Sequence, residues 1–299
     1  GWGIDMSKGL QVQKEAVDPD SPALSRPFAL LAFDWDGTAV ASRRHPAEDL
    51  LGRTVPLTEL GVWLVVITGT HYENLDRQYF SKLPPQARAR HVPCVNRGSE
   101  LFGFDAAGRL EAIRIRDELA DGGLQTEVIF DRVNRRKLDL IPLPEWANPP
   151  KERIGELLEA VRARLAAAGI EGGIQGIMDR VEEIAAEVGL DLRLTTDVKH
   201  VEFGLTDKAD SVAYVAGQLA PARDIRPEDI LILGDEFGPI DGFEGSDYKT
   251  FVLAGATYVS VGREPNGTPE GVLHVGGGPE AFLGLLDRQL RLHRERKPA

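Results

Sequence analysis

Short apolar runs that stop abruptly at polar and small residues set the strongest limit on the fold of this chain. Three of them occupy residues 28–33, ending at Asp34, residues 62–67, ending at Thr68 and Gly69, and residues 230–233, ending at Gly234 and Asp235. Helical stretches separate the runs, which is typical of parallel strands buried on both faces of a sheet. We therefore predict an α/β fold whose core is a Rossmann-like, doubly wound parallel sheet.

The polar residues at the ends of these runs are the first candidates for a binding site. In open α/β sheets, ligands bind beyond the carboxyl ends of the parallel strands. Asp34, Thr68 and Asp235 each stand at such an end. Although they are far apart in the sequence, we expect them to meet in one crevice.

A region with its own helices lies between the second and third runs. Residues 151–168 place apolar side chains on one helical face, and a second helix is expected around residues 177–188. The predicted organisation is a flexible leader at 1–26, a core domain formed by 27–116 and 202–299, and an inserted α+β cap domain at 117–201.

The segment Asp34-Trp35-Asp36-Gly37-Thr38 is the most specific chemical signal in the chain. Two like charges about 4 Å apart repel by roughly 4 kcal/mol at an effective dielectric constant near 20, so the two carboxylates need either a solvated turn or a cation. Magnesium binds a few carboxylate oxygens together with water and substrate phosphate, and it leaves a carboxylate able to attack phosphorus.

This segment resembles the first motif of the haloacid dehalogenase superfamily, in which the first aspartate is the nucleophile and the second is the general acid and base. The resemblance assigns these roles to Asp34 and Asp36. Thr68 and Gly69 resemble the second motif, which binds the transferring phosphoryl group. Lys208 resembles the third motif, a lysine that neutralises charge between the nucleophile and the phosphate.

Asp235 and Glu236, after the third apolar run, are similar to the fourth motif, whose first aspartate is a magnesium ligand. The commonest pattern has a second acid four residues further on, where this chain has Pro239. Asp247 is our candidate for that acid, with Glu236 and Asp241 as alternatives. The resemblance thus implies a Mg²⁺ site formed by Asp34, Asp36, Asp235 and Asp247.

Together the motifs imply a Mg²⁺-dependent phosphatase that acts on a small phosphate monoester through an aspartyl-phosphate intermediate. The large insertion between the second and third motifs is similar to the cap of Cof-type and sugar-phosphate phosphatases, so the expected substrate is a sugar or sugar-acid phosphate. A phosphomutase shares all four motifs and is an alternative. A non-catalytic binding or regulatory module with the same fold is another.

Composition narrows the partners of the chain. The formal net charge of −12 argues against nucleic acid, which binds surfaces rich in Lys and Arg. No apolar run approaches the roughly 20 residues of a membrane span, and residues 1–26 show no signal-peptide pattern, so we expect no membrane partner and a cytoplasmic location. Residues 132–137 are basic in this acidic chain. Within them, Arg135 and Arg136 are candidate substrate contacts, or else part of a solvated strand edge.

Overall fold

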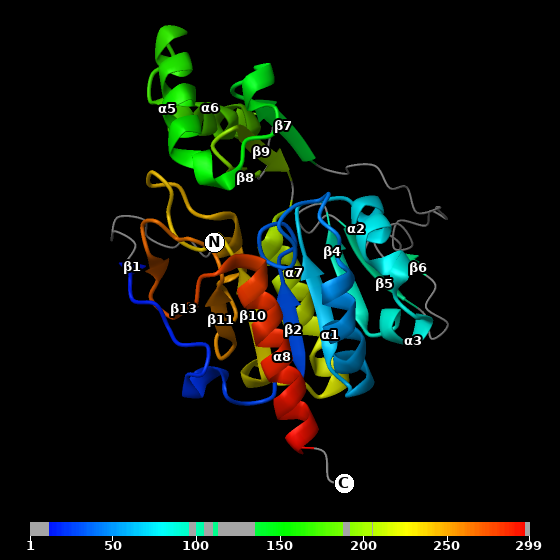
Figure 1. The fold of residues 1–299 in the computed structure, drawn as a ribbon. Helices are drawn as coiled ribbons and strands as arrows, with labels where there is room; N and C mark the ends of the chain where they lie inside the picture. Colours follow the sequence, from blue (N-terminus) through cyan, green and yellow to red (C-terminus); the bar gives the residue numbers. More distant parts are fainter. Residues whose placement is uncertain are drawn as a thin grey trace. The chain divides into compact units, whose positions relative to one another are not determined.

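The computed structural model describes residues 12–95, 100–104, 110–112, 135–187, 192–204 and 206–296. The chain divides into two compact units, both drawn in Figure 1. The first unit contains residues 1–131 and 208–299, and the second contains residues 132–207.

A sheet with the strand order β13-β11-β10-β2-β3-β4-β5-β6 forms the centre of the first unit (Figure 1). The strands from β13 to β4 pair in parallel, and β5 and β6 continue the sheet with antiparallel pairing. Their bounds are β2 Leu30–Phe33, β3 Trp63–Ile67, β4 His91–Val95, β5 Glu100–Phe104, β6 Leu110–Ala112, β10 Ile230–Gly234, β11 Thr257–Ser260 and β13 Val272–His274. The predicted α/β fold with a parallel central sheet is confirmed.

Helices cover both faces of this sheet. Neighbouring residues of β2 point to opposite faces, so each packs against different helices. Phe33 packs in one apolar cluster with Leu57 of α1 and with Phe282 of α8, whose ring centroid lies 5.0 Å from that of Phe33. Ala32 packs in a second cluster with Val212 of α7. Among the described residues of this unit, the α-helices are α1 Glu48–Glu59, α2 Tyr72–Gln78, α3 Pro85–Arg88, α7 Lys208–Tyr214 and α8 Gly278–Arg296.

The segment before β2 differs from the prediction of a flexible leader at residues 1–26. Its described part begins with β1 (Val12–Gln13), which pairs antiparallel with β12 (Thr268–Pro269). The backbone N–H of Val17 donates to the carbonyl oxygen of His274 at 2.7 Å, and Leu24 is buried in the core. Residues 12–26 are therefore anchored to the core at a few points, through the backbone hydrogen bonds of β1 and Val17 and the buried side chain of Leu24.

The described part of the second unit combines a three-stranded antiparallel sheet with two α-helices. The strand order is β7-β9-β8, with bounds β7 Arg135–Asp139, β8 Arg193–Thr196 and β9 His200–Gly204. Helix α5 (Ile154–Ala167) buries Leu157, Val161 and Leu165, which share one face as their spacing predicts, and α6 spans Gly173–Glu187. Residues 117–134 of the predicted insert lie outside the described residues. Across the described ranges, every helix is too short or too polar to span a lipid bilayer.

Candidate active site

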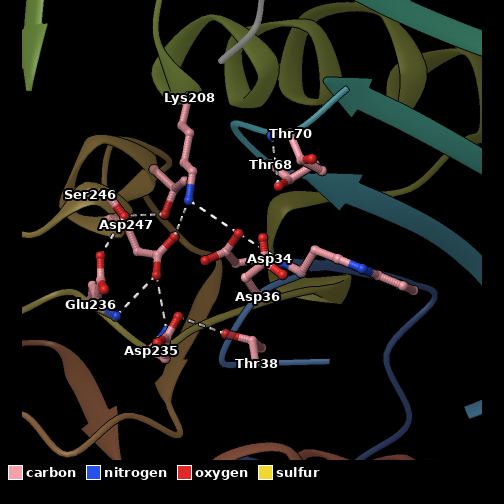
Figure 2. Close-up of polar contacts among 12 residues, drawn as sticks. Asp34, Asp36, Thr38, Thr68, Thr70, Lys208, Asp235, Glu236, Ser246 and Asp247 are labelled. Carbon is pink, nitrogen blue, oxygen red and sulfur yellow. Dashed lines mark hydrogen bonds and ion pairs between the residues drawn. The ribbon is translucent and has the colours of Figure 1, made fainter. Parts of the chain in front are cut away.

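The three strand ends singled out in the sequence lie side by side in the sheet. Strand β2 lies between β10 and β3, so Asp34, Asp235 and Thr68 follow three adjacent strands (Figure 2). The backbone N–H of Asp34 donates to the carbonyl oxygen of Leu233 at 3.0 Å, which extends the pairing of β2 with β10 as far as the site. The predicted convergence of these strand ends follows from this order.

The turn after Asp34 depends on a glycine. Gly37 has a φ of +84°, in the left-handed region that favours glycine, and its N–H donates to the carbonyl oxygen of Val40 at 2.7 Å. The turn brings Thr38 back toward β10, where its hydroxyl donates to Oδ1 of Asp235 at 3.1 Å. The first and fourth motifs are therefore in direct contact.

Lys208 is the first residue of α7 and is buried with two carboxylates. Its Nζ lies 3.2 Å from Oδ1 of Asp34 and 2.7 Å from Oδ1 of Asp247 (Figure 2). Burial lowers the pKa of Lys208, but the carboxylates of Asp247 and Asp34 raise it by more, so the net pKa is above its usual value. The lysine is therefore positively charged at neutral pH.

Three carboxylates lie close together at this site, and two of them contact the lysine. Asp34, Asp235 and Asp247 each offer one oxygen, and these oxygens lie within 4.8 Å of one another. Lys208 offsets one of the three negative charges, so a divalent cation would offset the other two. The donor set consists of carboxylate oxygens alone, which fits Mg²⁺.

Asp247 also holds the loop that follows β10. Its Oδ2 accepts hydrogen bonds from the backbone N–H groups of Asp235 at 2.9 Å and Glu236 at 3.0 Å. Burial raises the pKa of the Asp247 carboxyl, but Lys208 and the backbone N–H donors of Asp235 and Glu236 together lower it by more, so its net pKa is below the usual value. Asp247 thus connects the loop with the lysine of α7.

The other acids of the predicted set have different surroundings. Oδ2 of Asp36, which was predicted as a fourth ligand, lies 3.3 Å from Nε of Arg43, and Asp36 is not a member of the three-carboxylate group. Glu236 accepts a hydrogen bond from the hydroxyl of Ser246 at 3.0 Å, and Asp241 is exposed. Among the three candidates for the second acid of the fourth motif, Asp247 is the one that the structure brings next to Asp34 and Asp235.

The predicted phosphate-binding and substrate-binding residues fall into two groups. Thr68 and Gly69 follow β3 at the site, and Thr68 is buried and accepts a hydrogen bond from the N–H of Thr70 at 3.2 Å (Figure 2). Arg135 and Arg136 belong to the second unit, where their backbones in β7 pair with β9. The side chains of these two arginines lie outside what the structure describes.

Glu264 is a buried acid that no sequence motif revealed. One carboxylate oxygen accepts from the N–H of Phe237 and from the hydroxyl of Ser260, and the other accepts from the N–H of Gly238, all at 2.7 Å. Burial raises the pKa of the Glu264 carboxyl above its usual value. Since Phe237 and Gly238 follow Asp235 in the same loop, Glu264 fixes the path of that loop.

Glycines allow the same loop to pack closely. A Cβ added at Gly262 would lie 1.8 Å from the carbonyl oxygen of Asp235, and one added at Gly245 would lie 2.0 Å from that of Glu236. Both distances are far below van der Waals contact, so a side chain at either position would displace the backbone next to Asp235.

Comparisons with known proteins agree with this fold. No family profile matches the sequence. No curated protein matches it either. Solved structures do match: the trehalose-6-phosphate phosphatase C-terminal domain of C. albicans aligns with a TM-score of 0.57 and 13% identity, over 93% of this chain and 98% of that one.

Two further structures come from other organisms. The sucrose-phosphatase of Synechocystis, bound to sucrose and phosphate, aligns with a TM-score of 0.52 and 16% identity, over 88% of this chain and 98% of that one. The IMP-bound IMP-nucleotidase of Plasmodium falciparum aligns with a TM-score of 0.52 and 15% identity, over 89% and 69%. At such identities the similarity shows the fold alone, which this chain shares with a trehalose-6-phosphate phosphatase domain, a sucrose-phosphatase and an IMP-nucleotidase.

Proposed function

We propose that the protein is a Mg²⁺-dependent phosphatase that hydrolyses a small phosphate monoester through an aspartyl-phosphate on Asp34. The observation that carries this proposal is the position of Asp34, 3.2 Å from a buried lysine and inside a group of three carboxylates at the end of β2. A nucleophilic carboxylate, a fixed positive charge and a site for a divalent cation are the groups that phosphoryl transfer to a side chain requires.

In the proposed mechanism, a carboxylate oxygen of Asp34 attacks phosphorus while Asp36 protonates the departing alkoxide. Lys208 and Thr68 stabilise negative charge on the phosphoryl oxygens. Asp36 then takes a proton from the water that hydrolyses the aspartyl-phosphate, which restores Asp34. Mg²⁺ held by Asp34, Asp235 and Asp247 would act as a Lewis acid toward the phosphoryl group.

We also propose that the second unit acts as a cap that selects the leaving group. The residues of the core site are suited to phosphate and metal, so they do not distinguish one alcohol from another, and discrimination has to come from additional polar groups. Arg135 and Arg136 are the proposed contacts in this unit, and a sugar or sugar-acid phosphate is the proposed substrate. The names of two proteins of similar fold, a sucrose-phosphatase and a trehalose-6-phosphate phosphatase, support a sugar phosphate.

The nucleophile is tested by Asp34→Asn. We expect turnover of phosphorylated sugars to fall by roughly 10⁴-fold or more, because an amide does not form the phosphorylated intermediate, while circular dichroism shows an unchanged fold. Beryllium fluoride, a phosphoryl mimic, should inhibit the wild type by binding at Asp34. The matched control is Asp49→Asn, an exposed position in α1, which should keep full activity. Substantial turnover by Asp34→Asn would contradict the covalent mechanism.

The metal is tested by chelation. Removing divalent cations should abolish turnover and added Mg²⁺ should restore it, whereas Ca²⁺, which takes more ligands at longer distances, should inhibit. Turnover that persists in chelator would contradict the metal. A requirement for a bisphosphate activator would identify a phosphomutase instead, and a failure to hydrolyse any phosphate ester would favour a binding module.

A further inference from the structure

A basic cavity of about 510 Å³ lies on the first unit, outside the cluster of Asp34, Lys208 and the other carboxylates. Its charged lining consists of four cations, Arg43, Arg44, Arg77 and Lys82, and one carboxylate, Glu48. This local excess of positive charge is unusual in a chain with a formal net charge of −12. A cavity with this lining favours an anionic ligand.

The wall of the cavity is fixed by a buried side chain. The side-chain amide N–H groups of Gln78, at the end of α2, donate to the carbonyl oxygens of Ser42 and His45. The amide oxygen of Gln78 accepts from the indole N–H of Trp35 at 2.8 Å. Gln78 therefore ties the loop that carries Arg43 and Arg44 both to α2 and to the residue between Asp34 and Asp36.

Two of the four cations in the lining are available to bind a ligand. Lys82 is paired with Glu48 at 2.9 Å. In contrast, Arg44 and Arg77 are exposed and form no ion pair with any residue that the structure describes, and Arg77 donates to the neutral side chain of Asn74. Planar guanidinium groups bind carboxylates and phosphates through paired hydrogen bonds.

The cavity borders the proposed acid of the reaction. Arg43 lines it and also places Nε 3.3 Å from Oδ2 of Asp36. In the proposed mechanism, Asp36 contacts the oxygen of the leaving group, so the alcohol portion of the substrate lies on the Asp36 side of the site. Arg43 therefore connects the cavity with the acid that the proposed mechanism places at the leaving group.

We propose that this basic cavity binds an anionic group, a carboxylate or a second phosphate, carried on the alcohol portion of the substrate. The inference rests on the proposed phosphatase function and narrows its substrate class to phosphate esters with a second negative group. Arg44 and Arg77 bind that group, and Arg43 connects it with Asp36.

Matched pairs of substrates test this assignment. Sorbitol 6-phosphate is compared with 6-phosphogluconate, and glycerol 1-phosphate with 3-phosphoglycerate, because the members of each pair differ only by a carboxylate in place of a hydroxymethyl group. In at least one pair we expect the wild type to prefer the member with the carboxylate by roughly tenfold or more in kcat/KM. This is the size of effect that a charge-assisted hydrogen bond produces. Arg44→Gln and Arg77→Gln should each reduce this preference by roughly tenfold.

The control is Arg291→Gln, the same change of charge at an exposed position of α8, which should leave the preference unchanged. The absence of a preference for the carboxylate-bearing member in both pairs, or equal losses on both members in Arg44→Gln, would overturn the proposal. The assignment to the substrate would also be overturned if free citrate changed the turnover of both members equally and Arg44→Gln removed that effect, since the ligand would then be a separate effector. Failure of the wild type to hydrolyse any ester, including an aryl phosphate, would instead contradict the phosphatase function itself.

Discussion

Each of the two units buries a lysine, and the two lysines have different surroundings. In the second unit, Nζ of Lys199 lies 3.0 Å from both carboxylate oxygens of Asp139 and 3.0 Å from the carbonyl oxygen of Ile141. In the first unit, Nζ of Lys208 lies 3.2 Å from Asp34 and 2.7 Å from Asp247. Both lysines are 6% exposed, so burial alone does not distinguish them.

The difference between them is the balance of charge. One carboxylate neutralises Lys199, and its three N–H groups have three acceptors on the protein. Two carboxylates contact Lys208, and that of Asp235 is close to both, so negative charge is in excess. A balanced ion pair needs no further charge, whereas an unbalanced cluster is suited to a cation and a ligand.

The largest expected effect comes from removing each lysine in turn. Lys208→Met should lower kcat by roughly 10²- to 10³-fold, because the transition state loses a fixed positive charge. Lys199→Met should change kcat by less than about threefold but lower the free energy of unfolding by about 1 to 3 kcal/mol, because it removes charge-assisted hydrogen bonds. Steady-state kinetics and urea unfolding measure the two effects. Equal losses of kcat would remove the distinction between the lysines.

Because the cluster around Lys208 has an excess of negative charge, we expect Mg²⁺ to raise the free energy of unfolding of the protein. At a Mg²⁺ concentration about 100 times the dissociation constant, the free energy of unfolding should rise by about 2.7 kcal/mol relative to chelator, because the metal binds the folded state. Asp235→Asn should remove most of this gain, whereas Asp139→Asn should keep it. Urea unfolding with and without Mg²⁺ is the measurement. A gain that survives in Asp235→Asn would place the cation elsewhere.

Glu264, unlike the two lysines, is a buried acid whose carboxylate is held by backbone N–H and hydroxyl donors. In Glu264→Gln an amide N–H group would face a backbone N–H donor, so we expect a loss of about 1 to 3 kcal/mol in the free energy of unfolding and a higher Mg²⁺ concentration for half-maximal activity. Glu270→Gln, at an exposed position of the same segment, is the control. An unchanged Mg²⁺ requirement in Glu264→Gln would show that the loop next to Asp235 does not depend on this acid.

The smallest effect concerns the pH dependence of the balanced pair. Burial raises the pKa of Asp139, but Lys199, the N–H of Ile141 and His200 together lower it by more, so the net pKa is below the ordinary value of 3.8. The pair therefore stabilises the folded state fully above that value, and this stabilisation is lost as the pH falls through the folded pKa. The free energy of unfolding of the wild type should exceed that of Asp139→Asn by about 1 kcal/mol or less near neutral pH, since Asp139 is partly exposed. A difference that does not shrink below about pH 4 would contradict this ion pair.

Sequence patterns predicted the sheet and part of the site for a local reason. Strands that are buried on both faces need continuous apolar runs, so β2, β3 and β10 were recognisable from composition over a few residues. The residues directly after such runs, Asp34 and Asp235, were recognisable with them. The contacts of residues 12–26 with the core were not recognisable, because Leu24 and the pairing of β1 with β12 are too short to form a pattern.

By itself, the sequence determined the α/β class, the strand ends that carry the first and fourth motifs, and the lysine at the start of α7. Only the tertiary structure decided that Asp247, and not Glu236 or Asp241, joins Asp34 and Asp235, and that Glu264 and Gln78 hold the loops around them. These contacts join residues far apart in the chain. Their distances depend on the order of strands in the sheet and on the paths of loops, which no local pattern of residues specifies.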